Sequence, residues 1–204
     1  EHLNKYLSQG DMIIGNASKV VPARLFFQKE SGALIEILCL SPHEMPYAEA
    51  FSQTNKVVFS AYIGNSKKWK TGKLTCTLND ITITAERKGS TKDAFIVEFS
   101  WNKSIPFSQV LEACGKVPIP PYFEREEELI DRSRYQTVFA KWEGSVAAPT
   151  AGLHYDQLVM ERLKNDGVVF QYLTLHVGAG TFKPVTTDVI SGHEMHNESF
   201  EVSK

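Results

Sequence analysis

The chain has 204 residues, of which 42% are hydrophobic, 11% aromatic and 23% charged, and its mean hydropathy is −0.23. This balance is that of a globular protein with a core, and it excludes a disordered, collagen-like or coiled-coil chain. The 22 Lys and Arg residues against 24 Asp and Glu residues give a net charge of −2. Bulk charge therefore does not draw the chain onto nucleic acid, and any RNA contact must come from a local patch.

The start of the chain and its cysteines bear on where the protein works. No apolar run approaches the length needed to span a bilayer, and residues 1–5 lack both an initiator Met and the plan of a signal peptide. We therefore expect a soluble fragment of a longer protein, with no membrane partner. Cys39, Cys76 and Cys114 are widely spaced and odd in number, which excludes a disulfide framework and a Cys-x-x-Cys zinc site. This cysteine usage favours a reducing, cytoplasmic location.

The first half of the chain reads as a succession of strands, beginning with apolar runs at residues 11–14 and 20–25. Between residues 29 and 103 the expected strands lie at 34–38, 57–62, 74–78, 81–85 and 94–99. The third and fourth alternate apolar residues with threonines and are separated only by Asn79 and Asp80, which is typical of a hairpin. Because no helical stripe there is long enough to cover a sheet, we expect a small antiparallel barrel that closes to hide its edges.

Helical segments are expected after the barrel. A short helix at about residues 109–113 ends at Gly115 and leads into a stiff, proline-rich segment over 117–122. A charged helix is expected next, from Glu124 to about Tyr135.

The pattern then becomes strand, helix, strand. The strands are expected at residues 145–148 and 168–175, with the helix at 155–164 between them. Such a unit is nearly always a right-handed crossover between parallel strands. Residues 149–154 and 176–181 are therefore expected to leave the carboxyl edge of one sheet, which is where α/β proteins bind ligands.

The predicted fold is an α/β main domain with a parallel β-α-β unit, plus an inserted small antiparallel β-barrel. The α/β domain is discontinuous and covers residues 1–28 and 104–204. The inserted barrel domain covers residues 29–103.

Four of the six histidines fall in the last quarter of the chain: His154, His176, His193 and His196. His193 and His196 have a spacing found in metal sites, but a structural or surface role is an equally good interpretation for that pair. His154 and His176 each follow a strand at the expected ligand edge and lie near glycines, which let a substrate approach the backbone. A metal-dependent hydrolase built on all four is a weaker alternative, because no carboxylate lies at zincin spacing.

Glycines accompany both strand ends. The Gly-Ala-Gly-Thr segment at residues 178–181 lacks the third glycine of a dinucleotide-binding fingerprint, so a Rossmann interpretation is weak. As a tight loop at a strand end, its amides could bind a carboxylate or a ribose. The substrate contacts expected at the two strand ends are Thr150, Gly152, Gly178, Gly180 and Thr181.

Lysines surround a tryptophan in one turn of the expected barrel. The residues are Lys67, Lys68, Trp69, Lys70 and Lys73. On charge alone a solvated loop is favoured. The alternative is a phosphate patch with a stacking ring, which small barrels use for RNA, with Lys67, Lys68, Trp69 and Lys70 as the contacts. That alternative supports a non-catalytic RNA-binding module as a second function.

Five motifs occur along the chain in a fixed order: PIPPY at 118–122, RYQTVFA at 134–140, GSVAAPTAGLH at 144–154, TLHVGAGTF at 174–182 and HEMH at 193–196. In this order they resemble the motifs of the S-adenosylmethionine:tRNA ribosyltransferase-isomerases, the QueA family of queuosine biosynthesis. The resemblance runs across the whole chain, although members of that family are longer at both ends. The family has an α/β main domain with an inserted β-barrel, which agrees with the predicted fold.

The resemblance implies transfer of the ribosyl group of S-adenosylmethionine to 7-aminomethyl-7-deazaguanine in the tRNA anticodon, giving epoxyqueuosine with release of adenine and methionine. S-adenosylmethionine is then a substrate, no cofactor and no metal are implied, tRNA is the partner, and we expect a monomer. The sulfonium acidifies the neighbouring 5′ carbon, so the enzyme needs a positioned base and a dry, oriented pocket. Imidazole titrates near neutral pH, and we expect His154 or His176 to be that base.

The match to the family is incomplete near the start. The family pattern is Asn-Asp-Thr-Arg-Val-Ile-Pro-Ala-Arg-Leu, whereas residues 16–25 read Asn-Ala-Ser-Lys-Val-Val-Pro-Ala-Arg-Leu. Ala17 lacks the carboxylate and Lys19 lacks the planar bidentate fork of Arg. Because of these departures, an alternative hypothesis remains: the chain is a divergent member of the family that acts on another acceptor. Asn16 and Arg24 match the pattern and are added to the expected substrate contacts.

Overall fold

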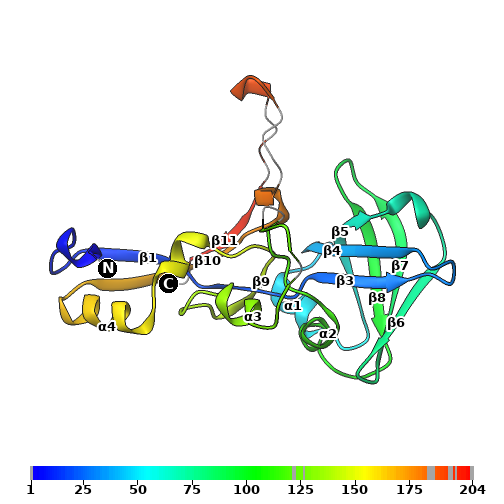
Figure 1. Ribbon diagram of the computed structural model, residues 1–204, viewed down its shortest axis with the longest axis horizontal. Helices are drawn as coiled ribbons and strands as arrows, with labels where there is room; N and C mark the ends of the chain where they lie inside the picture. The colour runs from blue at the N-terminus through cyan, green and yellow to red at the C-terminus, as the bar shows by residue number, and fades with distance from the viewer. Residues whose placement is uncertain are drawn as a thin grey trace. The chain divides into compact units, whose positions relative to one another are not determined.

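The computed structural model describes residues 2–120, 123–125, 127–182, 187–192, 195 and 197–202. The chain forms two compact units (Figure 1). The α/β unit consists of Glu1–Val20 and Glu128–Lys204, and the barrel unit consists of Val21–Glu127.

The barrel unit is built on one antiparallel sheet of six strands in the order β3-β4-β5-β8-β7-β6. The strands are β3 (Arg24–Gln28), β4 (Leu34–Pro42), β5 (Lys56–Gly64), β6 (Lys73–Leu78), β7 (Ile81–Ser90) and β8 (Phe95–Trp101). The sheet curls until β3 approaches β6, so it nearly closes (Figure 1). The antiparallel, barrel-like sheet expected from the strand pattern is therefore confirmed. Strand β3 joins it because it pairs with β4 along its whole length.

Alternating strand residues and two short helices fill the barrel. In β5, alternate side chains are buried: Val57, Phe59, Ala61 and Ile63. The helices are α1 (Tyr47–Ser52) and α2 (Phe107–Cys114). The ring of Phe107 lies 5.2 Å from that of Phe59 and 5.3 Å from that of Trp101. The short helix expected before Gly115 is thus present, and its aromatic side chain packs into the barrel core.

The charged segment that follows is not the helix predicted over residues 124–135. Among the described residues of this segment, only those of α3 (Asp131–Arg134) are helical, and Glu124 has a φ of +51°. The carboxylate of Asp131 accepts a hydrogen bond from the backbone N–H of Glu128 at 2.8 Å, which closes a turn just before the helix. In a longer helix Glu124 and Glu128 would face one another and repel.

The α/β unit holds two small sheets. Strand β10 pairs in parallel with β1 and antiparallel with β11, while β9 pairs in parallel with β2. Their bounds are β1 (Met12–Asn16), β2 (Ser18–Val20), β9 (Trp142–Ser145), β10 (Val169–His176) and β11 (Ser199–Glu201). Helix α4 (Gln157–Asn165) connects β9 to β10. The 3₁₀ helices of the chain include η1 (Leu3–Lys5), η2 (Ser66–Lys68), η4 (Thr150–His154), η5 (Ala179–Phe182) and η6 (Ile190–Gly192).

Parallel pairing was expected here, but the partners differ from the expectation. The strands before and after α4 were predicted to share one sheet, whereas β9 and β10 lie in different sheets. The cause is a change of partner at Ala17. Its N–H donates to the Leu173 carbonyl at 2.8 Å, while its own carbonyl accepts from the N–H groups of Lys141 and Trp142 at 2.8 and 3.0 Å. Ala17 is therefore the junction of the two sheets.

No helix in the described part of the chain has the length and apolar character needed to cross a membrane.

Candidate active site

Two segments leave neighbouring strand ends in the α/β unit. The backbone N–H groups of Val146 and Ala147 donate to the carbonyl of Val177 at 2.8 and 3.2 Å. These bonds tie the chain just after β9 to the chain just after β10. Helix η4 follows the first strand end and η5 follows the second. The structure thus brings together the starts of the two segments that hold most of the predicted site residues.

Buried hydroxyl groups fix this junction. The Oγ of Ser145 donates to the Oγ of Ser18 at 2.6 Å and accepts from the N–H of Val177 at 3.0 Å. Both serines are buried. Sequence reasoning did not identify either one; the signal that could have found them is a serine beside small apolar residues, as at Ala17 and at Val146–Ala148.

Asn16 belongs to the same network. Its Oδ1 accepts from the N–H groups of Ser18 and Leu175, both at 3.0 Å, and its Nδ2 donates to the Leu175 carbonyl at 2.9 Å. The side-chain amide is thus committed to the backbone of β2 and β10. The Asn16 side chain therefore orients these two strands at the junction.

His176 is the last residue of β10 and is half-buried. Burial lowers the pKa of His176 below its ordinary value of 6.5, and the charge of Glu201 opposes that shift. The imidazole is therefore neutral at neutral pH and able to accept a proton. Because alternate strand residues share a face, His176 lies on the same face of β10 as Phe170 and Tyr172.

Aromatic rings gather on this face of β10. The ring of Phe139 lies 5.6 Å from that of Tyr172 and 6.2 Å from that of Tyr155. A Cβ on Gly15 would lie 3.2 Å from both Phe139 and Tyr172, so the two rings pack over this glycine. Tyr172 is 38% exposed. A partly open ring face on the same strand as a neutral imidazole suits a planar base or a sulfonium cation.

The site residues predicted in η4 differ in their exposure. Thr150 and His154 are exposed. Gly152 is half-buried, and its N–H donates to the Pro149 carbonyl at 2.8 Å. A Cβ on Gly152 would lie 2.7 Å from Cγ2 of Thr137, so this position requires glycine for packing.

The loop after β10 binds a carboxylate of the protein itself. The N–H of Gly178 donates to Oε1 of Glu198 at 3.0 Å. Gly180 is half-buried and Thr181 is exposed. The backbone amide of Gly178, which was expected to bind a substrate carboxylate, binds the carboxylate of Glu198 in this structure. Sequence reasoning did not identify Glu198, since its partner lies 20 residues away along the chain.

Arg24 belongs to the barrel unit, where its Nε lies 3.0 Å from Oε1 of Glu36 in an ion pair. Lys19, one of the two departures from the family pattern, pairs with Glu143 at 3.2 Å. His193 and His196 lie outside the described residues.

Trp69 does not have the expected role of a stacking ring. It is 1% exposed, and its Nε1 donates to the Gly72 carbonyl at 3.1 Å. The ring belongs to the core of the barrel unit and is not available to a nucleic-acid base. Lys67, Lys68 and Lys70 are exposed, as expected for a charged patch.

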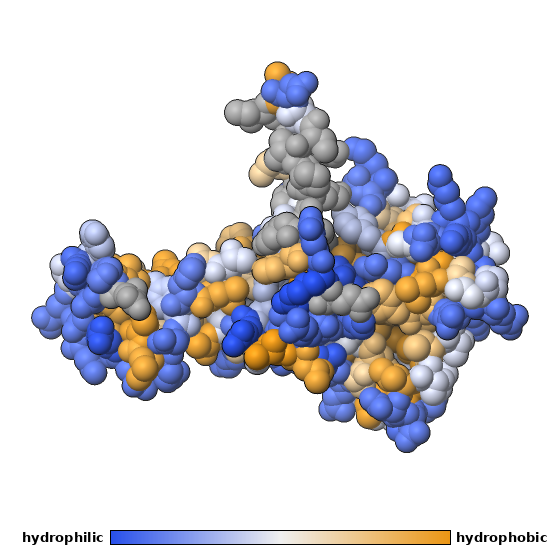
Figure 2. Space-filling model, in the orientation of Figure 1, coloured by the Kyte–Doolittle hydropathy of each residue, from blue (hydrophilic) through white to orange (hydrophobic). Residues whose placement is uncertain are grey.

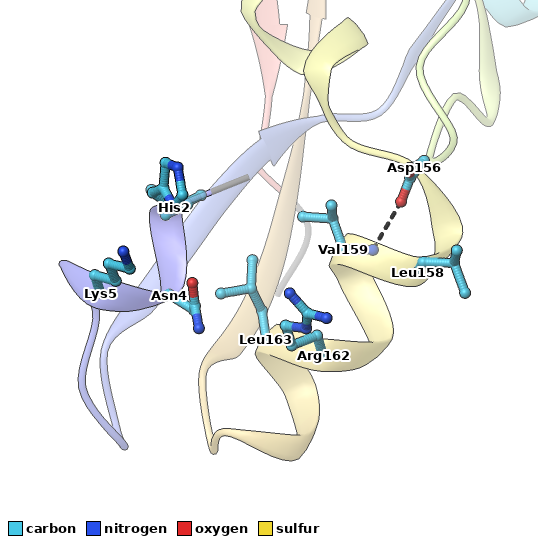
Figure 3. Close-up of a pocket in the computed structure, with 9 residues that line it drawn as sticks. His2, Asn4, Lys5, Asp156, Leu158, Val159, Arg162 and Leu163 are labelled. Atoms are coloured by element: carbon cyan, nitrogen blue, oxygen red, sulfur yellow. Dashed lines mark hydrogen bonds between the residues drawn. The ribbon is translucent and has the colours of Figure 1, made fainter.

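A cavity of about 540 Å³ lies between η1 and α4 (Figure 3). Its lining includes Lys5, Arg162 and Asp156, and the Asp156 carboxylate accepts from the N–H of Val159 at 2.7 Å and caps α4. None of the residues that line it is an expected site residue. Within the described ranges, no group of three or more His, Cys, Asp or Glu residues is placed to hold a metal ion.

Comparisons with known proteins agree with one another. The sequence model of the family described as "Queuosine biosynthesis protein" matches residues 1–204. The chain is 41% identical over 198 residues to the S-adenosylmethionine:tRNA ribosyltransferase-isomerase of Legionella pneumophila. It is 38% identical over 205 residues to the protein of the same name from Caldanaerobacter subterraneus. These matches cover 97% and 100% of this chain but 54% and 56% of the relatives, so the chain spans about half their length.

A solved structure of an S-adenosylmethionine tRNA ribosyltransferase from Thermotoga maritima is similar over 86% of this chain and 44% of that chain. The identity is 24% and the TM-score is 0.31.

Proposed function

Because the chain belongs to the queuosine biosynthesis protein family, we propose that it acts as an S-adenosylmethionine:tRNA ribosyltransferase-isomerase on 7-aminomethyl-7-deazaguanine in the tRNA anticodon. The observation that carries this proposal is 41% identity over 97% of the chain to a protein of that name. In the reaction a bond forms between the aminomethyl nitrogen and a carbon of the former ribosyl group. The bonds from that group to adenine and to sulfur break, and its carbons close to the epoxycyclopentane ring. The 5′ carbon and the aminomethyl nitrogen each lose a proton, of which one goes to the leaving adenine and the other to solvent, so adenine and neutral methionine leave. The cytoplasm is the proposed location, since the tRNA substrate is found there.

His176 is the proposed general base. The sulfonium acidifies the adjacent 5′ carbon, so the protein must supply a neutral acceptor at a fixed position. Burial keeps the pKa of His176 low, and the backbone of β10 holds the residue in place. His154 is exposed at the end of η4 and is the alternative base. The preference for His176 rests on its partial burial, which limits the access of competing water.

The aromatic face formed by Phe139 and Tyr172 beside Gly15 is the proposed binding site of S-adenosylmethionine. Tyr172 offers a partly exposed ring for stacking with adenine, and ring faces attract a sulfonium cation. Thr150, Thr181 and the amides of the 178–181 loop would contact the polar parts of the substrate. The carboxylate of Glu198 must then exchange with the substrate for the Gly178 amide.

The test is product release from S-adenosylmethionine in the presence of precursor tRNA. Adenine and methionine are expected in equal amounts, and only when the tRNA carries the aminomethyl base. Adenine released without modified tRNA would contradict the proposal and would favour a divergent relative that acts on another acceptor.

A further inference from the structure

The turn between β5 and β6 concentrates positive charge. We call residues 65–72 the lysine loop. Lys67, Lys68 and Lys70 are exposed within it, and none of them forms an ion pair with any residue that the structure describes. Hydrophilic residues cover this end of the barrel unit in Figure 2. In a chain of net charge −2, this is a local reversal of sign.

The lysine loop is held in one conformation from its buried side. Trp69 anchors it in the core, and the carbonyl of Trp69 accepts from Nη1 of Arg87 at 2.9 Å. The Arg87 guanidinium in turn lies 4.0 Å from the centre of the Phe95 ring. At the start of the loop, Nδ2 of Asn65 donates to the Leu34 carbonyl at 3.0 Å. The backbone that carries the lysines is therefore ordered before any ligand arrives, which reduces the entropy cost of binding.

A fourth lysine extends the charged surface. The Nζ of Lys29, on the β3-β4 turn, donates to the Lys68 carbonyl at 2.8 Å. The two carboxylates closest to Lys29 along the chain, Glu30 and Glu36, form no ion pair with these lysines in the described structure. Glu30 forms none, and Glu36 is engaged by Arg24 at 3.0 Å.

We propose that the lysine loop binds phosphate groups of an RNA backbone, and specifically those of the tRNA in the proposed function, on which this inference rests. Ammonium groups are point charges that suit phosphates and carry no sequence information. Because Trp69 is buried, the loop offers no ring for base stacking. It also exposes no apolar side chain that could enter a membrane interface, which disfavours an anionic lipid surface. The loop is a sequence-independent docking surface that positions tRNA.

The test compares tRNA binding by the unaltered protein with binding by a triple variant, Lys67→Ala, Lys68→Ala and Lys70→Ala, across a series of salt concentrations. Each lost phosphate contact should make the slope of log affinity against log salt shallower by about 0.7 to 0.9. A triple variant of equal charge change serves as control: Lys5→Ala, Lys103→Ala and Lys164→Ala. These three lysines are exposed and lie outside the loop, so the control should keep the slope of the unaltered protein.

Two further measurements keep the outcomes distinct. The loop variant should keep its unfolding midpoint and its affinity for S-adenosylmethionine within twofold. If it binds tRNA with unchanged affinity and slope, the inference is wrong while the proposed function stands. If the unaltered protein binds no tRNA and releases no adenine with it, the proposed function itself has failed. Loop-dependent binding to anionic lipid vesicles without binding to tRNA would also overturn the inference.

Discussion

At the scale of single residues, the account depends most on His176. A positioned general base contributes about 10²–10⁴-fold in rate, so His176→Gln should lower turnover by that order. S-adenosylmethionine affinity should change little, because the loss falls on proton transfer and not on binding. Single-turnover adenine release and a separate binding titration measure the two quantities. A matched His154→Gln variant should lose less; if it alone abolishes turnover, the exposed histidine is the base.

The low pKa of His176 also predicts how stability depends on pH. Burial lowers the pKa of His176 in the folded state below the ordinary value of 6.5, which the unfolded chain keeps. Below pH 6.5 the unfolded state therefore binds more protons than the folded state, so stability is full above that pH and falls as the pH drops toward the folded pKa. Urea unfolding at several pH values should show this loss, and His176→Gln should reduce it. Identical pH profiles for the two proteins would show that His176 titrates normally.

Trp69 is a second residue whose role the structure decides. As a fully packed core ring, Trp69→Ala should cost about 3–5 kcal/mol of unfolding free energy. Trp69→Phe fills most of the space, so it should fold and keep its tRNA affinity. Urea titrations and tRNA binding measure both effects. If the Trp69→Phe protein is stable but binds tRNA more than tenfold less tightly, the result would indicate a direct contact between the Trp69 ring and RNA.

At the scale of elements, local patterns were informative where the partner strand is close in sequence. The alternation of Leu74, Cys76 and Leu78 predicted the β6-β7 hairpin, whose strands pair with each other. The same reasoning misplaced β9 and β10, because their partners β2 and β1 lie more than a hundred residues away and are exchanged at Ala17. The helix predicted over residues 124–135 was wrong for a local reason. The Asp131 carboxylate closes a turn with the N–H of Glu128, and the charge pattern does not reveal this turn.

One buried hydroxyl group, that of Ser145, reinforces the backbone hydrogen bonds between the chain ends that follow β9 and β10. Ser145→Ala leaves the Ser18 hydroxyl and the N–H of Val177 without this partner inside the protein. Unsatisfied buried polar groups cost about 1–3 kcal/mol, so the unfolding free energy of the variant, measured by urea titration, should be lower by that amount. Ser104→Ala, at an exposed site, is the control and should be neutral within about 0.5 kcal/mol. Equal stability of the two variants would mean that the network does not hold the strand ends together.

At the scale of the whole molecule, the ordered motifs identified the family from the sequence, and a family match over residues 1–204 confirms it. The site could be predicted only in part. The glycines and histidines at the strand ends were visible as motifs, whereas Ser18, Ser145 and Glu198 act through partners that only the folded chain brings close. Asn16 was expected at the substrate because it matches a motif, yet its amide is used by the backbone of β2 and β10.

The proposed function requires that the ribosyl group of S-adenosylmethionine passes to tRNA. The most direct measurement uses S-adenosylmethionine labelled with ¹³C in every ribosyl carbon, followed by mass spectrometry of the tRNA nucleosides, free adenine and methionine. All of the label is expected in the modified anticodon base, and the released adenine and methionine should carry none. Label that stays in a free ribosyl product, with the tRNA base unmodified, would contradict it.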